Sequence, residues 1–392
     1  MPAQYRVWLY DQDGDRVAWM NGYTYLSYTR KLNEPDSYEI HLPGDHWTVT
    51  AGYWELPAKL DGEIVVLRRP EDETDWSAET ACLNRYFRDA YEGANHYIYS
   101  MGRGALALLR RRLIVPAAGA AYDSRSGLAG NVIPAYINAQ AGPGAGARAI
   151  PDLYISGWAA VGNLVSEEAR YYRLDETIGQ LVAAGQVDLA IVPVYTAGMD
   201  DWDSIQAAGM TYLARQRYGW QLRLYHPQMG TDRRRGNAYG NAPVIFSLLR
   251  GNMQNPSYIW DGIDIGNHAY VLGQGTEADR AVLEVVDGSV GDSPWNDWEY
   301  SRDARNSSTV ATLLSTGRAE NEAQRAQEQF SFQSLETAGC RYGVHWTLGD
   351  WATADYAGRS FDVRCIEVKV TLSSDQSEEI AATWRADFAG GP

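Results

Sequence analysis

Apolar residues alternate with polar ones in several short runs of this sequence, and this period of two constrains the fold more than any other feature. The alternation is clear in residues 38–42, 220–225 and 342–348. Successive side chains of a β-strand point to opposite faces, so each run is typical of a strand with one buried face. Gly, Asn and Asp residues that favour turns separate the runs. The chain is therefore predicted to be a β-rich α+β protein.

One run near the carboxyl end changes its phase. Its apolar residues stand at odd positions from Phe361 to Cys365 and at even positions from Ile366 to Leu372. A strand changes the face that it buries through a bulge or a bend, a device found at barrel corners. Hairpins are also predicted over residues 5–19 and 85–99, and short strands at this spacing indicate a barrel or a sandwich.

The middle of the chain has a mixed α/β pattern. Apolar residues spaced like one helix face cover 174–185, with Asp175 as the expected N-cap. A buried strand is predicted over 187–195. A further helix is predicted over 104–113, ending in three arginines, and the longest helix over 309–330.

Residues 116–150 are rich in Ala, Gly and Pro. This composition favours a long loop or mobile insertion, interrupted by a short helix over 132–139. Changes in composition and pattern divide the chain into four predicted regions. They are a β region at 1–115, the insertion with an α/β domain at 116–240, a β-rich segment with the long helix at 241–334, and a second β region at 335–392.

The charge of the chain excludes several classes of function. It has 34 Lys and Arg against 50 Asp and Glu, a formal net charge of −16. Binders of nucleic acid or of anionic membranes need basic surfaces instead. No apolar run approaches the ~20 residues that span a bilayer, and no signal peptide is visible. The distant cysteines Cys82, Cys340 and Cys365 indicate reduced, buried thiols.

Aromatic residues are unevenly represented, with 26 Tyr and 14 Trp against 6 Phe. Tyr and Trp have an apolar body and a polar tip, so they suit half-buried strand faces and subunit interfaces.

A scan for reactive motifs finds no HExxH, GxSxG, Walker A or CxxC. Residues 11–15 begin like a calcium loop, but the glycine is misplaced and Gly22 stands where the final glutamate is needed, so a hairpin turn is predicted. Residues 273–278 match GxGxxA, yet a strand is expected where a dinucleotide site needs a helix. Of the six histidines, only His41 and His46 are close in sequence, and on a strand they point to opposite faces.

Acidic residues cluster at 71–75, 200–203 and 292–299. In the last cluster, Asp297 and Glu299 stand beside Trp295 and Trp298. A glycosidase needs two carboxylates across a sugar, and aromatic platforms often accompany them. Acidic loops are common in a chain with 50 acidic residues, so a solvated loop is preferred. We therefore expect no catalytic, cofactor-binding or metal-binding residues, no cofactor and no enzyme activity.

Three motifs occur in the order found in a known family. They are Gly102–Ile114 with its terminal arginines, the Gly-Thr-Asp-Arg turn at 230–233, and Tyr-Gly-Val-His-Trp-Thr-Leu-Gly-Asp at 342–350 followed by Ile-Glu-Val at 366–368. In their order and spacing, they resemble the siphophage tail hub, or baseplate hub-like, group of tail tip proteins, which is related in architecture to myophage central hub proteins.

This resemblance implies two β-barrel-like, tail-tube-like domains with an inserted mixed α/β region. It implies a structural virion protein of the phage tail tip, forming a baseplate hub ring without an active site. The implied partners are further copies in a homotrimer, the tail tube, distal tail proteins such as fibre or lysin components, and the tape measure protein. DNA would pass through the lumen without specific binding. No membrane anchoring is implied, and assembly in the host cytoplasm fits reduced thiols.

Two other classes stay open. A tail-associated cell-wall hydrolase needs two close carboxylates or a metal site in one cleft. A carbohydrate- or receptor-binding tail protein needs an aromatic platform that faces solvent.

Overall fold

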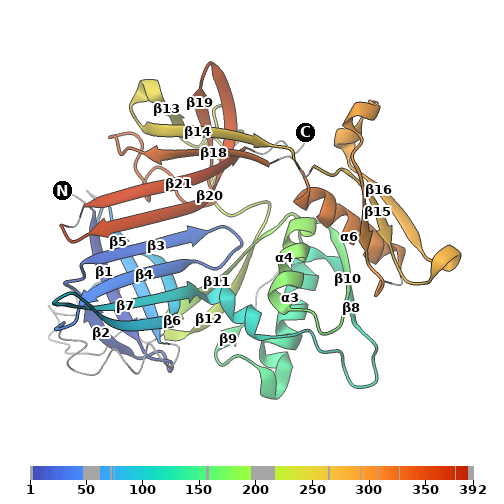
Figure 1. The fold of residues 1–392 in the computed structure, drawn as a ribbon, viewed down its shortest axis with the longest axis horizontal. Coiled ribbons are helices and arrows are strands. Elements are labelled where there is room, and N and C mark those ends of the chain that lie inside the picture. Colours follow the sequence, from blue (N-terminus) through green and yellow to red (C-terminus); the bar gives the residue numbers. More distant parts are fainter. Residues whose placement is uncertain are drawn as a thin grey trace.

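The computed structural model describes residues 3–46, 62–70, 73–74, 76–155, 159–195, 217–263, 265–291, 293–307, 309–325, 327–375 and 377–386. Strands dominate, and the predicted β-rich α+β class is confirmed. Figure 1 shows the large sheet at the left, helices α3 (Ala129–Gln140) and α4 (Leu174–Gly185) near the centre, and a small sheet with α6 (Val310–Ala323) at the right.

The large sheet has 13 strands. Those from the amino-terminal part are β1 (Gln4–Tyr10), β2 (Arg16–Met20), β3 (Tyr25–Lys31), β4 (Ser37–Pro43), β5 (Glu63–Arg69), β6 (Ser77–Glu92) and β7 (Asn95–Gly104). Those from the carboxyl-terminal part are β13 (Ile245–Ser247), β14 (Met253–Asp261), β18 (Gln327–Ser334), β19 (Trp351–Tyr356), β20 (Arg359–Ser373) and β21 (Glu378–Ala386). The predicted hairpins are present as the antiparallel pairs β1–β2 and β6–β7.

Strands β3 and β20 join the two parts. They pair antiparallel from Lys31 opposite Glu367 to Tyr25 opposite Ser373. The order along the sheet is β14-β18-β21-β20-β3-β4-β7-β6-β5-β1-β2, with β19 against β20 and β13 against β19. The β regions predicted at 1–115 and 335–392 therefore form one continuous sheet. Within the ranges that the structure describes, no sheet closes into a barrel.

Burial follows the alternation seen in the sequence. Tyr38, Ile40 and Leu42 of β4 are all buried in the main core. In β20 the buried positions are odd up to Cys365 and even from Val368 onward. The register against β21 shifts between Cys365 and Glu367, which confirms the predicted bulge.

The α/β region packs beside this sheet. Its elements are the 3₁₀ helix η1 (Ala105–Arg111), β8 (Asp123–Leu128), α3, η2 (Pro143–Arg148), β9 (Leu153–Tyr154), β10 (Leu164–Ala169), α4, β11 (Asp188–Tyr195) and β12 (Arg217–Tyr225). Helix α4 and its apolar stripe are confirmed, but Arg173 is the N-cap and Asp175 lies in the first turn. The helix predicted over 104–113 is a 3₁₀ helix with a basic end.

The predicted loop at 116–150 is wrong, because β8, α3 and η2 occupy most of it, but the short helix predicted over 132–139 is confirmed as part of α3. Ile133, Tyr136 and Ile137 stand on one face of α3 and are completely buried. The small residues permit close packing there: a Cβ on Gly130 would lie 2.1 Å from the carbonyl oxygen of Ala159. The composition therefore reflects tight helix packing rather than a lack of structure.

A small module follows, with a three-stranded sheet in the order β16-β15-β17. Its elements are β15 (His268–Leu272), η4 (Glu277–Asp279), β16 (Val282–Val286), η5 (Gly288–Val290), η6 (Pro294–Asn296), β17 (Glu299–Asp303) and α6, and η3 (Leu248–Arg250) precedes β14. Leu313 of α6 packs on Val271 and Val285. Residues 273–278 form the predicted strand connection.

Two predicted elements differ from the structure. The helix over 309–330 ends at Ala323, because Phe330 and Phe332 belong to β18 and pack in the main core. Residues 342–348 form turns rather than a strand, because Gly343 has a φ of +76° and its N–H donates to the carbonyl of Trp346 at 2.8 Å. Tyr342 and Trp346 thereby enter the same core.

The three cysteines are free and buried, as expected. Among the helices in the described ranges, none is long and apolar enough to cross a membrane.

Candidate functional site: buried polar junctions and the His268 cluster

The acidic and aromatic residues singled out in the sequence lie on the small module. Trp295, in η6, is 88% exposed, and Trp298 just after it is 49% exposed. Asp297 and Glu299 do come together: one carboxylate oxygen of each lies within 4.8 Å of the other and of a ring nitrogen of His268. Of the other acidic clusters, residues 71, 72, 75, 200–203 and 292 lie outside the described residues.

His268 is the residue that sequence reasoning missed. It begins β15 and stands opposite Glu299 in the parallel pair β15–β17. Its Nδ1 lies 2.7 Å from Oδ1 of Asp297, and its Nε2 lies 2.8 Å from Oε1 of Glu284 in β16. The usable signal is strand pairing, since these residues are far apart in sequence. We call His268, Glu284, Asp297 and Glu299 the His268 cluster.

The carboxylates of this cluster favour the protonated, positively charged form of His268. Burial lowers the pKa of His268, but hydrogen bonds to Asp297 and Glu284 outweigh burial and raise the pKa above its ordinary value. His268, Asp297 and Glu299 have ligand atoms within 4.8 Å of one another. In the described part of the chain, no other group of three or more His, Cys, Asp or Glu side chains has its ligand atoms this close together.

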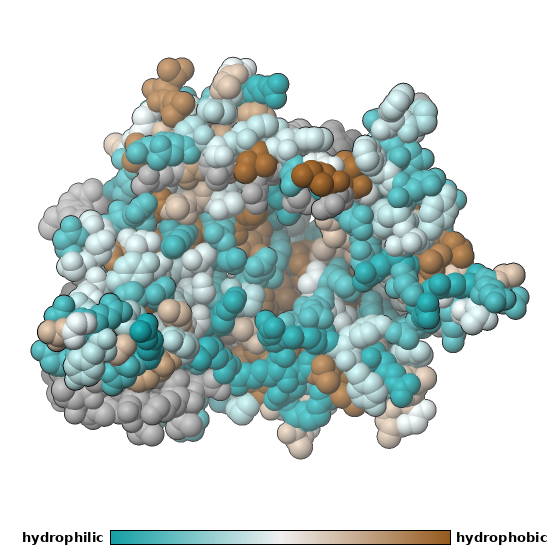
Figure 2. All heavy atoms as spheres, viewed as in Figure 1, coloured by the Kyte–Doolittle hydropathy of each residue, from teal (hydrophilic) through white to brown (hydrophobic). Residues whose placement is uncertain are grey.

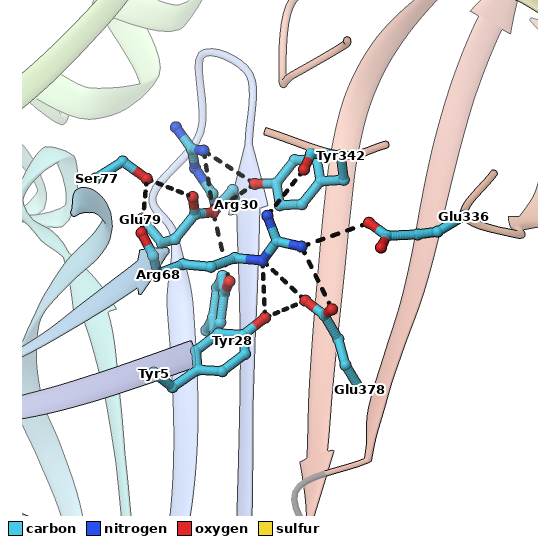
Figure 3. Close-up of polar contacts among 9 residues, drawn as sticks. All are labelled: Tyr5, Tyr28, Arg30, Arg68, Ser77, Glu79, Glu336, Tyr342 and Glu378. Carbon is cyan, nitrogen blue, oxygen red and sulfur yellow. Dashed lines mark hydrogen bonds and ion pairs between the residues drawn. The ribbon is translucent and has the colours of Figure 1, made fainter. Parts of the chain in front are cut away.

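A different polar cluster lies inside the protein between the two halves of the large sheet (Figure 3). Arg68 of β5 is 1% exposed at its centre. Its Nε donates to Oε1 of Glu378 at 2.8 Å, its Nη2 to Oε2 of the same residue at 3.3 Å, and its Nη1 to the carbonyl of Tyr342 at 2.8 Å. Tyr5 of β1 also donates to Glu378. One guanidinium thus links β5 to β21 and to the turns after β18.

Glu79 of β6 extends this network. Its Oε2 accepts from the Tyr342 hydroxyl at 2.6 Å and from Nη1 of Arg30 at 3.4 Å. Burial raises the pKa of Tyr342 and of Tyr28 well above the ordinary value, so both phenols stay neutral donors. Buried charges are costly unless each has a partner, and here the partners come from both ends of the chain. The cluster therefore fixes how the two halves of the sheet face each other.

We call the network around Arg68 and Glu79 the first junction. Asp350 forms a second junction. It is buried, and its Oδ1 accepts from the backbone N–H of Thr231 at 2.6 Å. Its Oδ2 accepts from the N–H of Thr347 at 3.0 Å and from Nε of Arg233 at 3.2 Å. Burial raises the pKa of Asp350 even though these hydrogen bonds lower it.

Asp188 forms a third junction, between the α/β region and the large sheet. This buried residue begins β11, and it accepts from the guanidinium of Arg364 in β20 and from the backbone N–H of Met229. Nδ2 of Asn33, in the β3–β4 turn, donates to it at 2.9 Å. The three junctions are suited to holding a rigid frame, because each joins segments that lie far apart in the sequence.

Solved structures of phage tail proteins have the same fold. The tail protein of Neisseria meningitidis MC58 is 10% identical, with a TM-score of 0.53 over 98% of this chain and 96% of that one. The 43 kDa tail protein of prophage MuSo2 from Shewanella oneidensis is 10% identical, with a TM-score of 0.52 over 97% of each chain. Prophage tail protein gp18 of Listeria monocytogenes EGD-e is 10% identical, with a TM-score of 0.53 over 98% of this chain and 95% of that one.

No curated protein is significantly similar to the sequence. The sequence matches the family described as Siphovirus ReqiPepy6 Gp37-like protein over residues 6–384. This match reaches from within β1 to within β21, so it takes in nearly all of the large sheet, and it agrees with the fold of the tail proteins. The chain therefore belongs to the family of Siphovirus ReqiPepy6 Gp37-like proteins, which are siphovirus tail proteins.

Proposed function

We propose that this chain is a structural subunit of the phage tail tip and forms the baseplate hub ring that joins the tail tube to distal tail components. The observation that carries the proposal is the exposed end of the large sheet. Strand β14 ends the sheet order, and among the described strands it pairs with β18 alone. An open edge bearing apolar side chains is a ready surface for another chain.

Apolar side chains lie exposed at both ends of β14. They are Leu248 and Leu249 in η3, and Ile259, Trp260 and Ile263. We call these five residues the edge patch. Figure 2 shows brown side chains at the top left, over η3, and again near the far end of β14. Closed rings use heterologous contacts, so each copy needs two different contact surfaces.

The remaining parts of the proposal follow from this role. The protein would be a component of the virion, assembled in the host cytoplasm, with two further copies in a homotrimer. Its neighbours would be the tail tube, the tape measure protein and distal fibre or lysin components. The two β-rich regions, roughly 5–100 and 335–385, would alternate around the lumen. A net charge of −16 suits a channel through which DNA passes without being held.

The decisive measurement is the rotational symmetry of this layer in a cryo-EM map of the intact tail tip. Three copies around the axis are expected. Six copies in one ring, or one copy beside the axis, would reject the proposal.

The proposal includes the absence of enzyme activity. Purified protein incubated with host cell walls is expected to release no soluble muropeptide or reducing sugar. Release that disappears on Asp297→Asn or Glu299→Gln would instead establish a tail-associated hydrolase. The high exposure of Trp295 favours a second candidate function, binding of a host carbohydrate. It predicts that a Trp295→Ala variant loses adsorption to host cells while tails still assemble.

A further inference from the structure

We propose that the His268 cluster binds one divalent transition metal ion of the Zn²⁺ class. His268 Nδ1, Asp297 and Glu299 would be the ligands. Glu284 would hold the histidine from its other side. This site is independent of the hub role, because none of its four residues belongs to the edge patch or to the three junctions.

The ligand atoms already lie close to the required arrangement. They are all within 4.8 Å of one another, and Nδ1 of His268 is 2.7 Å from Oδ1 of Asp297. Ligands around a zinc ion at about 2.1 Å lie roughly 3–3.4 Å apart. Glu299 has an exposed side chain and begins β17 directly opposite His268, so it can complete the set.

The other ring nitrogen of His268, Nε2, has a hydrogen-bond partner of the kind that metal-ligating histidines use. Nε2 lies 2.8 Å from Oε1 of Glu284. A metal-ligating histidine commonly donates its other N–H to a carboxylate, which fixes the tautomer and makes the ligating nitrogen more basic. Tyr270 adds a weaker contact, with its hydroxyl 3.4 Å from Oε1 of Glu299. Metal binding would replace the hydrogen bond between His268 and Asp297 and keep the one to Glu284.

The backbone that carries the ligands is held firmly. Asn267 is buried; its Oδ1 accepts from the N–H of Trp298 at 2.9 Å, and its Nδ2 donates to the carbonyl of Asn296 at 2.7 Å. The N–H groups of Asn267 and His268 each lie 3.2 Å from the carbonyl of Trp298. Asp297 is therefore fixed against His268 by the main chain on both of its sides, so little ordering remains when an ion binds.

The donor set selects the class of ion. Ca²⁺ and Mg²⁺ prefer oxygen ligands, whereas an imidazole with carboxylates suits zinc and its neighbours in the transition series. Three protein ligands leave at least one coordination position open toward solvent. The three thiols of the chain are buried, so they do not compete for the ion in the folded protein.

The test is calorimetric titration of the full, chelator-treated protein with Zn²⁺. One ion per chain is expected to bind. Asp297→Asn and Glu299→Gln should each weaken binding by more than about 10-fold, and Glu284→Gln by about 10–100-fold through the histidine. Mg²⁺ should not compete.

The matched control is Asp89→Asn. Asp89 lies 2.5 Å from Nε2 of His96, but this exposed pair has no third ligand in the described residues. Its loss should leave Zn²⁺ binding unchanged. Circular dichroism of each variant checks folding, and Glu284→Gln alters an exposed side chain. Absence of one-to-one binding by the unmodified protein would overturn the proposal, as would binding that survives the Asp297→Asn, Glu299→Gln double variant.

Discussion

The backbone N–H of Thr231 donates to Oδ1 of Asp350 at 2.6 Å, although 119 residues separate them in the sequence. Arg233 donates to the other carboxylate oxygen at 3.2 Å. A Cβ on Gly230 would lie 2.3 Å from the carbonyl carbon of Gly349, so both turns need glycine to approach so closely. The Gly-Thr-Asp-Arg and Leu-Gly-Asp motifs of the sequence are thus two sides of one contact.

Gly349→Val should lower the free energy of unfolding by roughly 1–3 kcal/mol. Gly349 has a φ of +88°, where a β-branched side chain is strained, and a Cβ there would lie 2.8 Å from the carbonyl oxygen of Met229. Urea denaturation monitored by tryptophan fluorescence measures the change.

Gly358→Val is the matched control. Gly358 has a φ of +76°, but its Cβ would meet no atom within 4 Å. It should therefore cost less than Gly349→Val, since it adds backbone strain without a close contact. Equal losses of unfolding free energy at the two positions would show that the close contact with Met229 does not contribute to the effect of Gly349→Val.

The sequence predicted those elements whose pattern is local. Alternation located β4, and the change of phase at Cys365 located the bulge in β20. The turns at 342–348 were not predicted, because Tyr342 and Trp346 alternate with polar residues as they would in a strand. Gly343, with its positive φ, turns the chain instead. Phe330 extended a helical stripe in the sequence, yet it packs in the core from β18 because burial there outweighs helix propensity.

The candidate site was predictable only in part. Asp297 and Glu299 were visible as neighbours, but His268 and Glu284 reach them through the pairing of β15 with β17 and β16. The junctions have the same character: Arg68 and Glu378 lie 310 residues apart. Partners of this kind depend on sheet order, which the pattern of one strand does not encode.

Arg68→Met should destabilise the protein by about 3–5 kcal/mol, because the largely buried carboxylate of Glu378 would be left without its cation. Adding Glu378→Met should recover part of this loss, since both charges of the pair are then removed. Chemical denaturation of the single and double variants measures both. Arg359→Met, on an exposed arginine of the β19–β20 hairpin, should change stability by less than about 0.5 kcal/mol. A double variant less stable than Arg68→Met would contradict this account of the cluster.

Glu167 should make stability depend on pH. Burial, with the charge of Glu168 adding to it, raises the pKa of Glu167 from 4.5 to about 7. Between these values the folded state keeps a proton that the unfolded state has released, so stability falls as pH rises through this window. Glu167→Gln should therefore be more stable than the unmodified protein by roughly 1–3 kcal/mol at pH 8 and equal to it near pH 4. Thermal denaturation across this range should show no such trend for Glu176→Gln, because that side chain is exposed.

Leu249→Asp should impair assembly without impairing folding. Leu249 is fully exposed in the middle of η3, so a charge there costs the isolated chain little, while a charge buried in a subunit contact without a partner is expensive. Tails purified from cells that express the variant should contain less of it than tails with the unmodified chain, and Trp260→Asp at the other end of the edge patch should act in the same direction. Quantitative mass spectrometry of the tails gives the copy number, and melting temperatures of the purified chains check the fold. Leu164→Asp alters another exposed leucine, on β10 and outside the edge patch, and should be incorporated normally. Normal incorporation of both edge-patch variants would show that β14 does not face a neighbouring subunit.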